Sequence, residues 1–89
     1  MYTAYFHKQF KKDIRNCKKQ GKDIEKIKYV IQKILEGSSI EDKYRLHKLL
    51  GIYKDRFECH IQSNLLLIFK KDGDSIIFER TGSHSELFK

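Results

Sequence analysis

The fold is decided by Leu65-Leu66-Leu67-Ile68-Phe69, a run that is apolar at every position. Successive side chains of a strand point to opposite faces, so such a run is typical of a central strand that is covered on both faces. A turn signal, Ser63-Asn64, precedes the run, and Asp72-Gly73 follows it where a tight hairpin turn is needed. The run therefore predicts the buried centre of a small sheet.

Two flanking segments have the alternating pattern of strands with one buried face. In Tyr53–Ile61 apolar and polar side chains alternate, and a strand there would bury the first set and expose the second. The two sets are Phe57, Cys59 and Ile61, and Arg56, Glu58 and His60. Ser75–Arg80 predicts the third strand of an antiparallel meander, with Phe78 and Arg80 on the same face.

The N-terminal part predicts a strand followed by a helical hairpin. Residues 2–6 are rich in aromatic side chains, which favour a strand. Apolar residues at helical spacing then predict a first helix that ends at Gln20-Gly21, and a second that is capped by Asp23 and closes at Gly37. The two apolar stripes are Phe6, Phe10, Ile14 and Cys17, and Ile24, Ile27, Val30, Ile31, Ile34 and Leu35.

The order of these elements predicts an α+β fold. An N-terminal strand and a two-helix hairpin pack on one face of a small, mainly antiparallel β-sheet, whose other face is left partly open. Residues 40–52 lack a clean period and predict a turn of helix and a loop that ends at Gly51. The tail from Thr81 is short and polar. With 89 residues, we expect 1–89 to form a single domain.

The charge of the chain is positive and unevenly spread. Nineteen basic and 12 acidic residues give a net charge of +7, and residues 1–36 hold ten of the basic and four of the acidic ones, a net of +6. This indicates a polyanionic partner, although a solvated lysine-rich helix face is equally compatible. No apolar run approaches the roughly 20 residues of a membrane span, and no signal-peptide pattern is present. We therefore expect a cytoplasmic protein without a membrane partner.

Imidazole and guanidinium groups gather in the C-terminal half. By strand parity His60 shares a face with Arg56, and Arg80 lies on a neighbouring strand. His47 precedes the sheet, and His84 follows it. Histidine exchanges protons near neutral pH, and arginine suits phosphate. RNA cleavage needs this combination: a base for the 2′-OH proton, an acid for the departing 5′ oxygen and a cation for the transition state. Solvated histidines without a role are the alternative.

We expect neither a metal site nor a thiol nucleophile. Cys59 and His60 are adjacent on a strand and point to opposite faces, which keeps them from binding one zinc ion together. Parity also turns Cys59 into the core, and the only other cysteine, Cys17, lies on an apolar helix stripe. RNA carries its own nucleophile, so its cleavage requires no cofactor. In a reducing compartment the two cysteines form no disulfide framework.

The C-terminal half carries a specific motif. His47-Lys48-Leu49-Leu50-Gly51 is followed by His60, thirteen positions after His47, then by the apolar strand and by the ending Phe78–Phe88. This pattern resembles the YafQ-type toxins of the RelE/ParE superfamily, the ribosome-dependent mRNA interferases of bacterial toxin–antitoxin pairs. The resemblance covers nearly the whole chain and implies a RelE-like fold.

The resemblance also implies partners and roles. Such toxins cut mRNA in the ribosomal A site and are silenced by a cognate, usually acidic antitoxin; we expect a monomeric toxin that joins a higher-order complex with it. Carried over by position, the expected catalytic residues are His47, His60, Arg80 and His84. Arg56, Asn64 and Phe88 are expected to contact RNA, and so are Lys11, Lys12, Lys18 and Lys19 of the first helix. Phe88 has an equal alternative as a core anchor of the tail.

Some positions depart from the family pattern. Asn64 stands where many relatives have aspartate, so it cannot act as an anion, although it still accepts a hydrogen bond. Relatives tend to place an aromatic residue and then arginine before the acidic residue, whereas this chain has the reverse order, Arg56-Phe57. By strand parity the reversal turns the guanidinium toward His60. Two other functions therefore remain open. One is a non-catalytic member of the superfamily that occupies the ribosome or, like the ParE branch, acts on DNA gyrase; the other is a plain basic RNA-binding domain.

Overall fold

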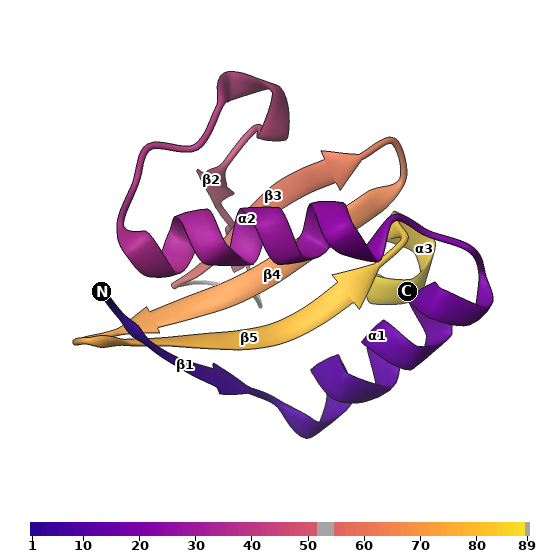
Figure 1. The fold of residues 1–89 in the computed structure, drawn as a ribbon, viewed down its shortest axis with the longest axis horizontal. Helices are drawn as coiled ribbons and strands as arrows, with labels where there is room; N and C mark the ends of the chain where they lie inside the picture. The colour runs from indigo at the N-terminus through magenta and orange to yellow at the C-terminus, as the bar shows by residue number, and fades with distance from the viewer. Residues whose placement is uncertain (52–54, 89) are drawn as a thin grey trace.

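The computed structural model describes residues 1–51 and 55–88. Its strands and helices follow one another in the order listed here (Figure 1): β1 (Thr3–Phe6), α1 (Lys8–Lys19), α2 (Ile24–Glu36), the 3-10 turn η1 (Asp42–Tyr44), β2 (His47–Lys48), β3 (Arg56–Gln62), β4 (Leu65–Asp72), β5 (Ser75–Gly82) and α3 (His84–Leu87). Within the described residues the sheet has five strands in the order β1-β5-β4-β3-β2. β1 runs parallel to β5 and the other pairs are antiparallel, so the predicted α+β fold is confirmed.

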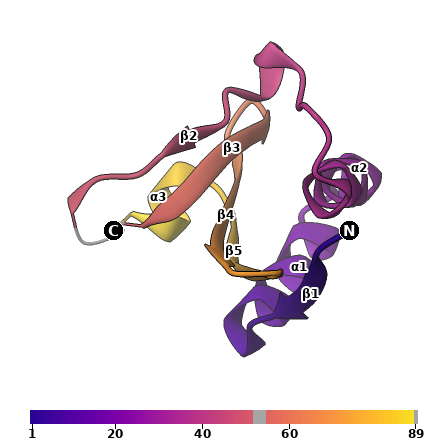
Figure 2. The ribbon, with the colours of Figure 1, turned by 90° about the vertical axis from the view of Figure 1, so that its left-hand side faces the viewer.

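The central strand β4 is buried on both faces, as its sequence predicts. Leu65, Leu67 and Phe69 join the core beneath α1 and α2. Leu66 and Ile68 point the other way and form a second cluster with Leu87, which Leu49 and Phe88 partly cover. Figure 2 shows α1 and α2 on one side of the sheet and α3 on the other. The partly open second face therefore carries α3 itself.

The helices begin and end where the capping signals predict. The Asp23 side chain accepts a hydrogen bond from the Lys26 backbone N–H at 3.1 Å, which satisfies a free donor at the start of α2. Gly37 ends α2 with a φ of 73°, a left-handed conformation in which glycine meets no steric penalty. Phe6, predicted as the first residue of the first helix stripe, is instead the last residue of β1 and is 42% exposed. The other stripe residues of both helices pack in one core with β4, so the predicted hairpin on one sheet face is confirmed.

Three short features differ from the sequence-based expectation. β2 lies in the segment expected to be a loop, and α3 forms in the short polar tail, for which no helix was predicted. Both are too short for a periodic signal to identify. The two-residue turn between β4 and β5 is Gly73-Asp74 instead of Asp72-Gly73, because Asp72 still pairs with Ser75. The expected start of β3 at Tyr53 lies outside the described residues.

A bulge between β4 and β5 changes the face of one predicted site residue. Phe69 pairs with Phe78, but the next residue of β4, Ile68, pairs with Arg80, so Glu79 is the extra residue. Simple alternation predicts Arg80 on the face of Phe78, and this is corrected. The bulge shifts Arg80 into register with Ile68, whose side chain belongs to the second cluster.

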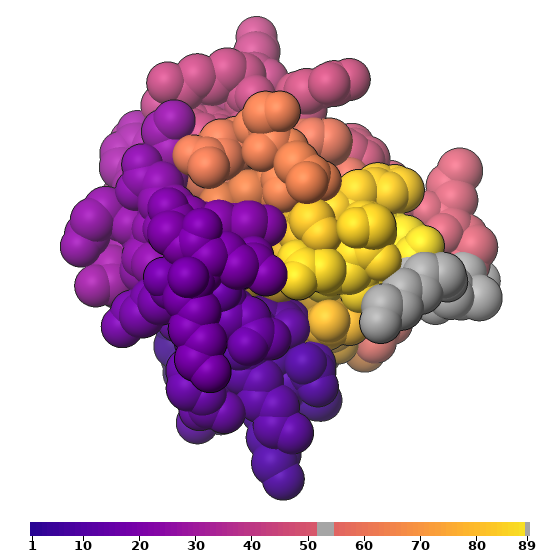
Figure 3. All heavy atoms as spheres, turned by 90° about the vertical axis from the view of Figure 1, so that its right-hand side faces the viewer, coloured from indigo at the N-terminus to yellow at the C-terminus, as the bar shows by residue number. Residues whose placement is uncertain are grey.

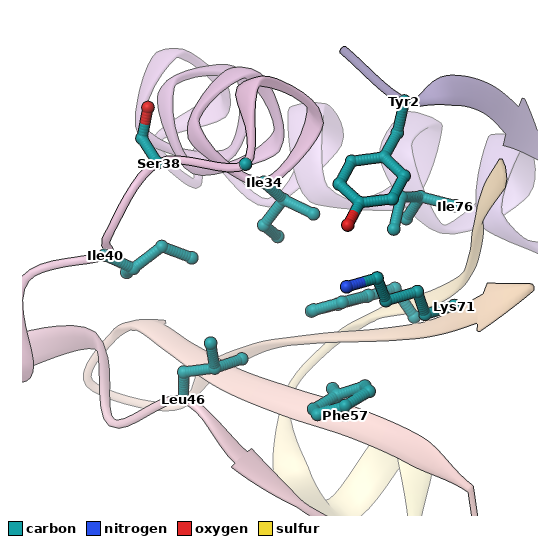
Figure 4. Close-up of a pocket in the computed structure, with 10 residues that line it drawn as sticks. Tyr2, Ile34, Ser38, Ile40, Leu46, Phe57, Lys71 and Ile76 are labelled. Atoms are coloured by element: carbon teal, nitrogen blue, oxygen red, sulfur yellow. The ribbon is translucent and has the colours of Figure 1, made fainter. Parts of the chain in front are cut away.

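A cavity of about 200 Å³ lies on the helix side of the sheet (Figure 4). Apolar side chains from α2, the following loop and β3 line it, among them Ile34, Ile40 and Phe57. At its edge the Lys71 ammonium group lies 4.8 Å from the centre of the Tyr2 ring, a cation–π contact. In the part of the chain that the structure describes, none of the predicted site residues lines this cavity. Within the described ranges, no helix is long and apolar enough to cross a membrane.

Truncation of the central strand tests its role in stability. Leu67 is 0% exposed and packs beneath the helices, so we expect Leu67→Ala to lower the free energy of unfolding by about 2–5 kcal/mol through lost burial and a residual cavity. Leu50 is 88% exposed, and Leu50→Ala is the control, with a change within about 0.5 kcal/mol. Urea denaturation measures both. A loss below about 1 kcal/mol for Leu67→Ala would contradict a tightly packed centre.

Candidate active site

Two imidazoles and one carboxylate form the centre of the candidate site. Glu58 Oε1 lies 3.3 Å from His47 Nε2 and 3.2 Å from His60 Nε2. The centres of the two imidazole rings are 5.9 Å apart. The sheet explains this arrangement, because His47 on β2 pairs directly with Glu58 on β3, and His60 lies two residues further along β3 on the same face. The structure therefore brings two of the predicted site residues, His47 and His60, close together.

Glu58 was not expected to be a site residue, and it is buried instead of exposed. Its side chain is 7% exposed, since Ile68 of the second cluster lies opposite it on β4. A buried carboxylate is stable only with partners, and here the two imidazoles provide them. The sequence signal that identifies it is its parity with His60 on the same strand. The second sheet face is covered at this point, which is why alternation alone gave the wrong exposure.

His47 faces an acceptor with each of its ring nitrogens. Nδ1 lies 2.7 Å from the backbone carbonyl oxygen of Arg45, and Nε2 faces the Glu58 carboxylate. The ring therefore lies between the Arg45 carbonyl oxygen and the Glu58 carboxylate, which orients it beside His60.

Arg80 belongs to the same row of the sheet. Ile68 pairs with Glu58 on one side and with Arg80 on the other, so the register aligns His47, Glu58, Ile68 and Arg80 across four strands. The Arg80 guanidinium makes a bidentate ion pair with Asp13 of α1, with Nε 2.8 Å from Oδ2 and Nη2 3.3 Å from Oδ1. Asp13 was missed by the sequence analysis, although an acid that continues the buried stripe between Phe10 and Cys17 is a recognisable signal.

Arg56 on β3 is held by a carboxylate on β5, across the intervening strand β4. Its Nε and Nη2 donate to the two oxygens of Glu79 on β5, at 2.8 and 3.2 Å. These hydrogen bonds to Glu79 raise the pKa of Arg56 above its ordinary value. The expected position of Arg56 on the face of His60 agrees with the register, which pairs Arg56 with Lys70 and His60 with Leu66. Its charge is partly compensated by Glu79.

α3 presents His84 at the surface. His84 is exposed, and its ring centre lies 4.9 Å from that of Phe88, which packs on the second cluster. Asn64 has a φ of 56° in the β3–β4 turn, and its side-chain oxygen accepts a hydrogen bond from the His84 backbone N–H at 3.3 Å. Asn64 therefore positions the start of α3, a role that an uncharged amide fills. Phe88 anchors the tail and also contacts His84.

Glu86 fastens α3 to the helix side of the molecule. Its Oε1 accepts a hydrogen bond from the Ser83 backbone N–H at 2.8 Å, and its Oε2 accepts one from the Gln20 side chain at 3.3 Å. Lys22 lies 3.8 Å from the same carboxylate. Figure 3 shows α3 in yellow between the purple segment that joins α1 to α2 and the orange β3–β4 turn. These hydrogen bonds, those from Ser83 first, lower the pKa of Glu86 to about 2.

The remaining predicted residues lie apart from this centre. Lys11, Lys12, Lys18 and Lys19 are exposed on α1. Cys59 is fully buried among the helix-side core residues, and burial raises its pKa to about 12. A thiolate at Cys59 is therefore unavailable near neutral pH, which agrees with its expected role in packing.

The imidazole–carboxylate trio is also a plausible metal-ligand set. The ligand atoms of His47, Glu58 and His60 all lie within 4.8 Å of one another. Two neutral imidazoles and a carboxylate suit zinc or copper, so the donor set fits a divalent ion even though the rejected pair Cys59–His60 does not. A metal held here would occupy the ring nitrogens that otherwise exchange protons.

Comparisons with known proteins show which family the chain is similar to. A family model described as "Bacterial toxin of type II toxin-antitoxin system, YafQ" matches residues 2–89. The mRNA interferase toxin YafQ of Escherichia coli K12 is 32% identical over 81 residues, which cover 90% of this chain and 88% of that protein. The crystal structure of the E. coli DinJ–YafQ complex superposes with a TM-score of 0.92 at 29% identity, with full coverage of both chains. A metal-bound toxin from Helicobacter pylori has a TM-score of 0.92 and 34% identity, with 99% and 100% coverage.

The low pKa of Glu86 predicts how stability depends on pH. A carboxyl group whose pKa is lower in the folded state stabilises the fold above its ordinary pKa, and this contribution is lost as the pH falls from about 4.5 toward 2. We expect Glu86→Gln to lower the Tm at pH 7 and to have little effect at pH 2. Glu25→Gln, on a surface pair with Lys28, is the control with a small effect at both values. An equal Tm loss at both pH values would contradict this assignment.

Proposed function

This chain belongs to the YafQ family of bacterial toxins of type II toxin–antitoxin systems, and we propose that it stops translation by cutting mRNA in the ribosomal A site. Its identity as an mRNA interferase, an endoribonuclease, follows from the curated relatives of that name. We further propose that cleavage depends on the ribosome and requires no metal ion. The observation that carries it is the Glu58 carboxylate between His47 and His60, in register with Arg80.

The proposed reaction uses the 2′-hydroxyl of the RNA as its nucleophile. A base removes the 2′-OH proton while the 2′ oxygen forms a bond to the adjacent phosphorus. The bond from phosphorus to the 5′ oxygen breaks, and an acid gives that oxygen a proton. The products are a 2′,3′-cyclic phosphate and a 5′-hydroxyl, so atoms and charge balance without a metal ion. The site must therefore supply a base, an acid and a cation.

The side chains of the site suit these three tasks. His84 is exposed on α3 and is proposed to transfer a proton at the scissile phosphate. His60 is proposed as its acid–base partner, held by Glu58 at 3.2 Å. His47 is proposed to contact the phosphate from its position beside the Glu58 carboxylate, 3.3 Å away. Arg80 is proposed to stabilise the charge of the transition state.

Other residues are proposed to hold the RNA. Phe88 lies beside His84 at the edge of the second cluster, where its partly buried ring can anchor the tail and stack on a base. Arg56 lies on the same face of β3 as His60 and is proposed to contact a phosphate despite its pairing with Glu79. Asn64 is proposed to affect RNA binding by positioning the start of α3, through the hydrogen bond that its side chain accepts from the His84 backbone N–H.

The basic helical half is proposed to bind two polyanionic partners at different times. Lys11, Lys12, Lys18 and Lys19 are exposed on α1 and would contact ribosomal RNA. The E. coli relative forms a complex with DinJ, and an acidic cognate antitoxin would meet the same net charge of +7. We propose a monomeric toxin that joins a larger complex with its antitoxin, in the cytoplasm where translation takes place.

The relative from H. pylori was solved as a metal-bound toxin. His47, Glu58 and His60 would hold such an ion, which acts as a Lewis acid when bound. The proposed reaction does not pass through it, because the imidazoles serve as proton-transfer groups only while their nitrogens are available.

Primer extension on a defined mRNA in a translating bacterial extract tests the proposal. We expect the wild type to cut at fixed codon positions, only when ribosomes are present. His84→Ala should slow cleavage roughly 100- to 10,000-fold by removing a proton-transfer group, with unchanged circular dichroism. The matched control is His7→Ala, which removes an exposed histidine at the start of α1 and should leave cleavage unchanged.

Three outcomes would contradict parts of this proposal. Full activity of His84→Ala at equal concentration would remove its catalytic role. Arrested translation with intact mRNA would indicate ribosome occupancy or another target such as DNA gyrase. Loss of wild-type cleavage after treatment with a chelator that removes zinc and copper but leaves Mg²⁺ for the ribosome would overturn the metal-independent reaction.

The lysines of α1 predict a salt-dependent affinity for ribosomes. Changing Lys11, Lys12, Lys18 and Lys19 to glutamine should weaken binding and flatten its dependence on salt, by about 0.7–0.9 in the logarithmic slope for each lost phosphate contact. Sedimentation with ribosomes at several salt concentrations measures this. The control changes Lys33, Lys43, Lys70 and Lys71, which alters the net charge equally. An equal effect of the two sets would mean that the α1 lysines are only solvated.

A further inference from the structure

Asp13 is a buried carboxylate on an otherwise basic helix. It is 5% exposed, while its neighbours Lys11 and Lys12 are exposed. Burial of a charge is unfavourable unless hydrogen bonds and an opposite charge compensate it. The four donors are Arg80 Nε at 2.8 Å, Arg80 Nη2 at 3.3 Å, the Thr81 backbone N–H at 3.1 Å and the Gln9 side chain at 3.2 Å. Such a complete set of partners fixes the carboxylate in one position.

The topology explains why this carboxylate meets β5. The parallel pairing of β1 with β5 ends at Phe6 and Phe78, so strand pairing with β1 stops before Thr81. α1 lies beside this part of β5, and Asp13 accepts the Thr81 N–H. The position of Asp13 is therefore set by the backbone of the same strand that carries Arg80, and it does not depend on the arginine alone.

Two parallel hydrogen bonds determine the plane of a guanidinium group. Asp13 engages Nε and Nη2 of Arg80 together, the bidentate geometry in which arginine is held most rigidly. The register places Arg80 in one row with Glu58 and His47. The ion pair with Asp13 therefore fixes the orientation of Arg80, the cation in the row that also holds Glu58 and His47.

We propose that Asp13 is a positioning residue of the ribonuclease, which orients the Arg80 guanidinium toward the scissile phosphate from behind the sheet edge. This inference rests on the proposed function of Arg80 as the cation that stabilises the transition state. Asp13 itself touches no reacting atom. Its effect is on the rate of the chemical step, since a cation that is misplaced by about 1 Å can slow a reaction roughly 100-fold.

A kinetic double-mutant cycle tests the proposal. Single-turnover cleavage on programmed ribosomes is measured at saturating toxin for the wild type, Asp13→Asn, Arg80→Ala and the double variant. Asp13→Asn keeps an acceptor for Thr81 but loses the charge, and we expect cleavage up to roughly 100-fold slower with unchanged ribosome affinity. In the Arg80→Ala background the same change should have little further effect, because the group that it orients is absent.

A merely structural role gives a different result. Asp13→Asn would then slow cleavage by the same factor with and without Arg80, and this outcome overturns the proposal, as does full activity of Asp13→Asn. Glu25→Gln removes a carboxylate charge from an exposed surface pair on α2, so it is the matched control and should cleave normally. Ile27→Val, a change of a buried core residue on α2, controls for a general loss of stability.

A second variant keeps the proposal falsifiable if Asp13→Asn does not fold. Arg80→Lys retains a positive charge but lacks the planar fork that Asp13 holds. We expect it to cleave nearly as slowly as Arg80→Ala, and wild-type cleavage by Arg80→Lys would show that orientation is not required. A wild type that leaves mRNA intact would instead refute the proposed function, and the role of Asp13 with it.

Discussion

Burial of β4 on both faces is the constraint on which the rest of the structure depends. Leu65, Leu67 and Phe69 hold α1 and α2 on one side, while Leu66 and Ile68 hold α3 on the other. A chain of 89 residues buries too little surface to support two independent cores. The strand therefore joins two clusters into one unit, and the site lies on the smaller of the two.

The candidate site depends on pairs of charges that the sheet brings together. Glu58 is buried between two imidazoles, and Asp13 is buried against Arg80. Both carboxylates are buried, which strengthens their interactions with the groups that they hold. The basic groups thus keep fixed positions, which is the preorganisation that the proposed transition-state stabilisation would require.

Much of this arrangement follows from patterns of short range. Several features are visible along the chain: the helix boundaries at Asp23 and Gly37, the apolar run from Leu65, and the motif with His47 and His60. Glu58 as a buried partner was not predicted, because its exposure depends on what covers the second face. α3 was not predicted either, because four residues carry no period and its stability comes from Glu86, Gln20 and Asn64.

The sequence by itself determined the fold class, the central strand and the set of histidines, because hydrophobic periods and capping residues act over a few neighbouring positions. Only the tertiary structure decided which groups meet. The bulge at Glu79 moves Arg80 into the row of Glu58, and α1 supplies Asp13 from 67 positions away. Such contacts depend on strand register and on the end of a neighbouring strand, which no local pattern specifies.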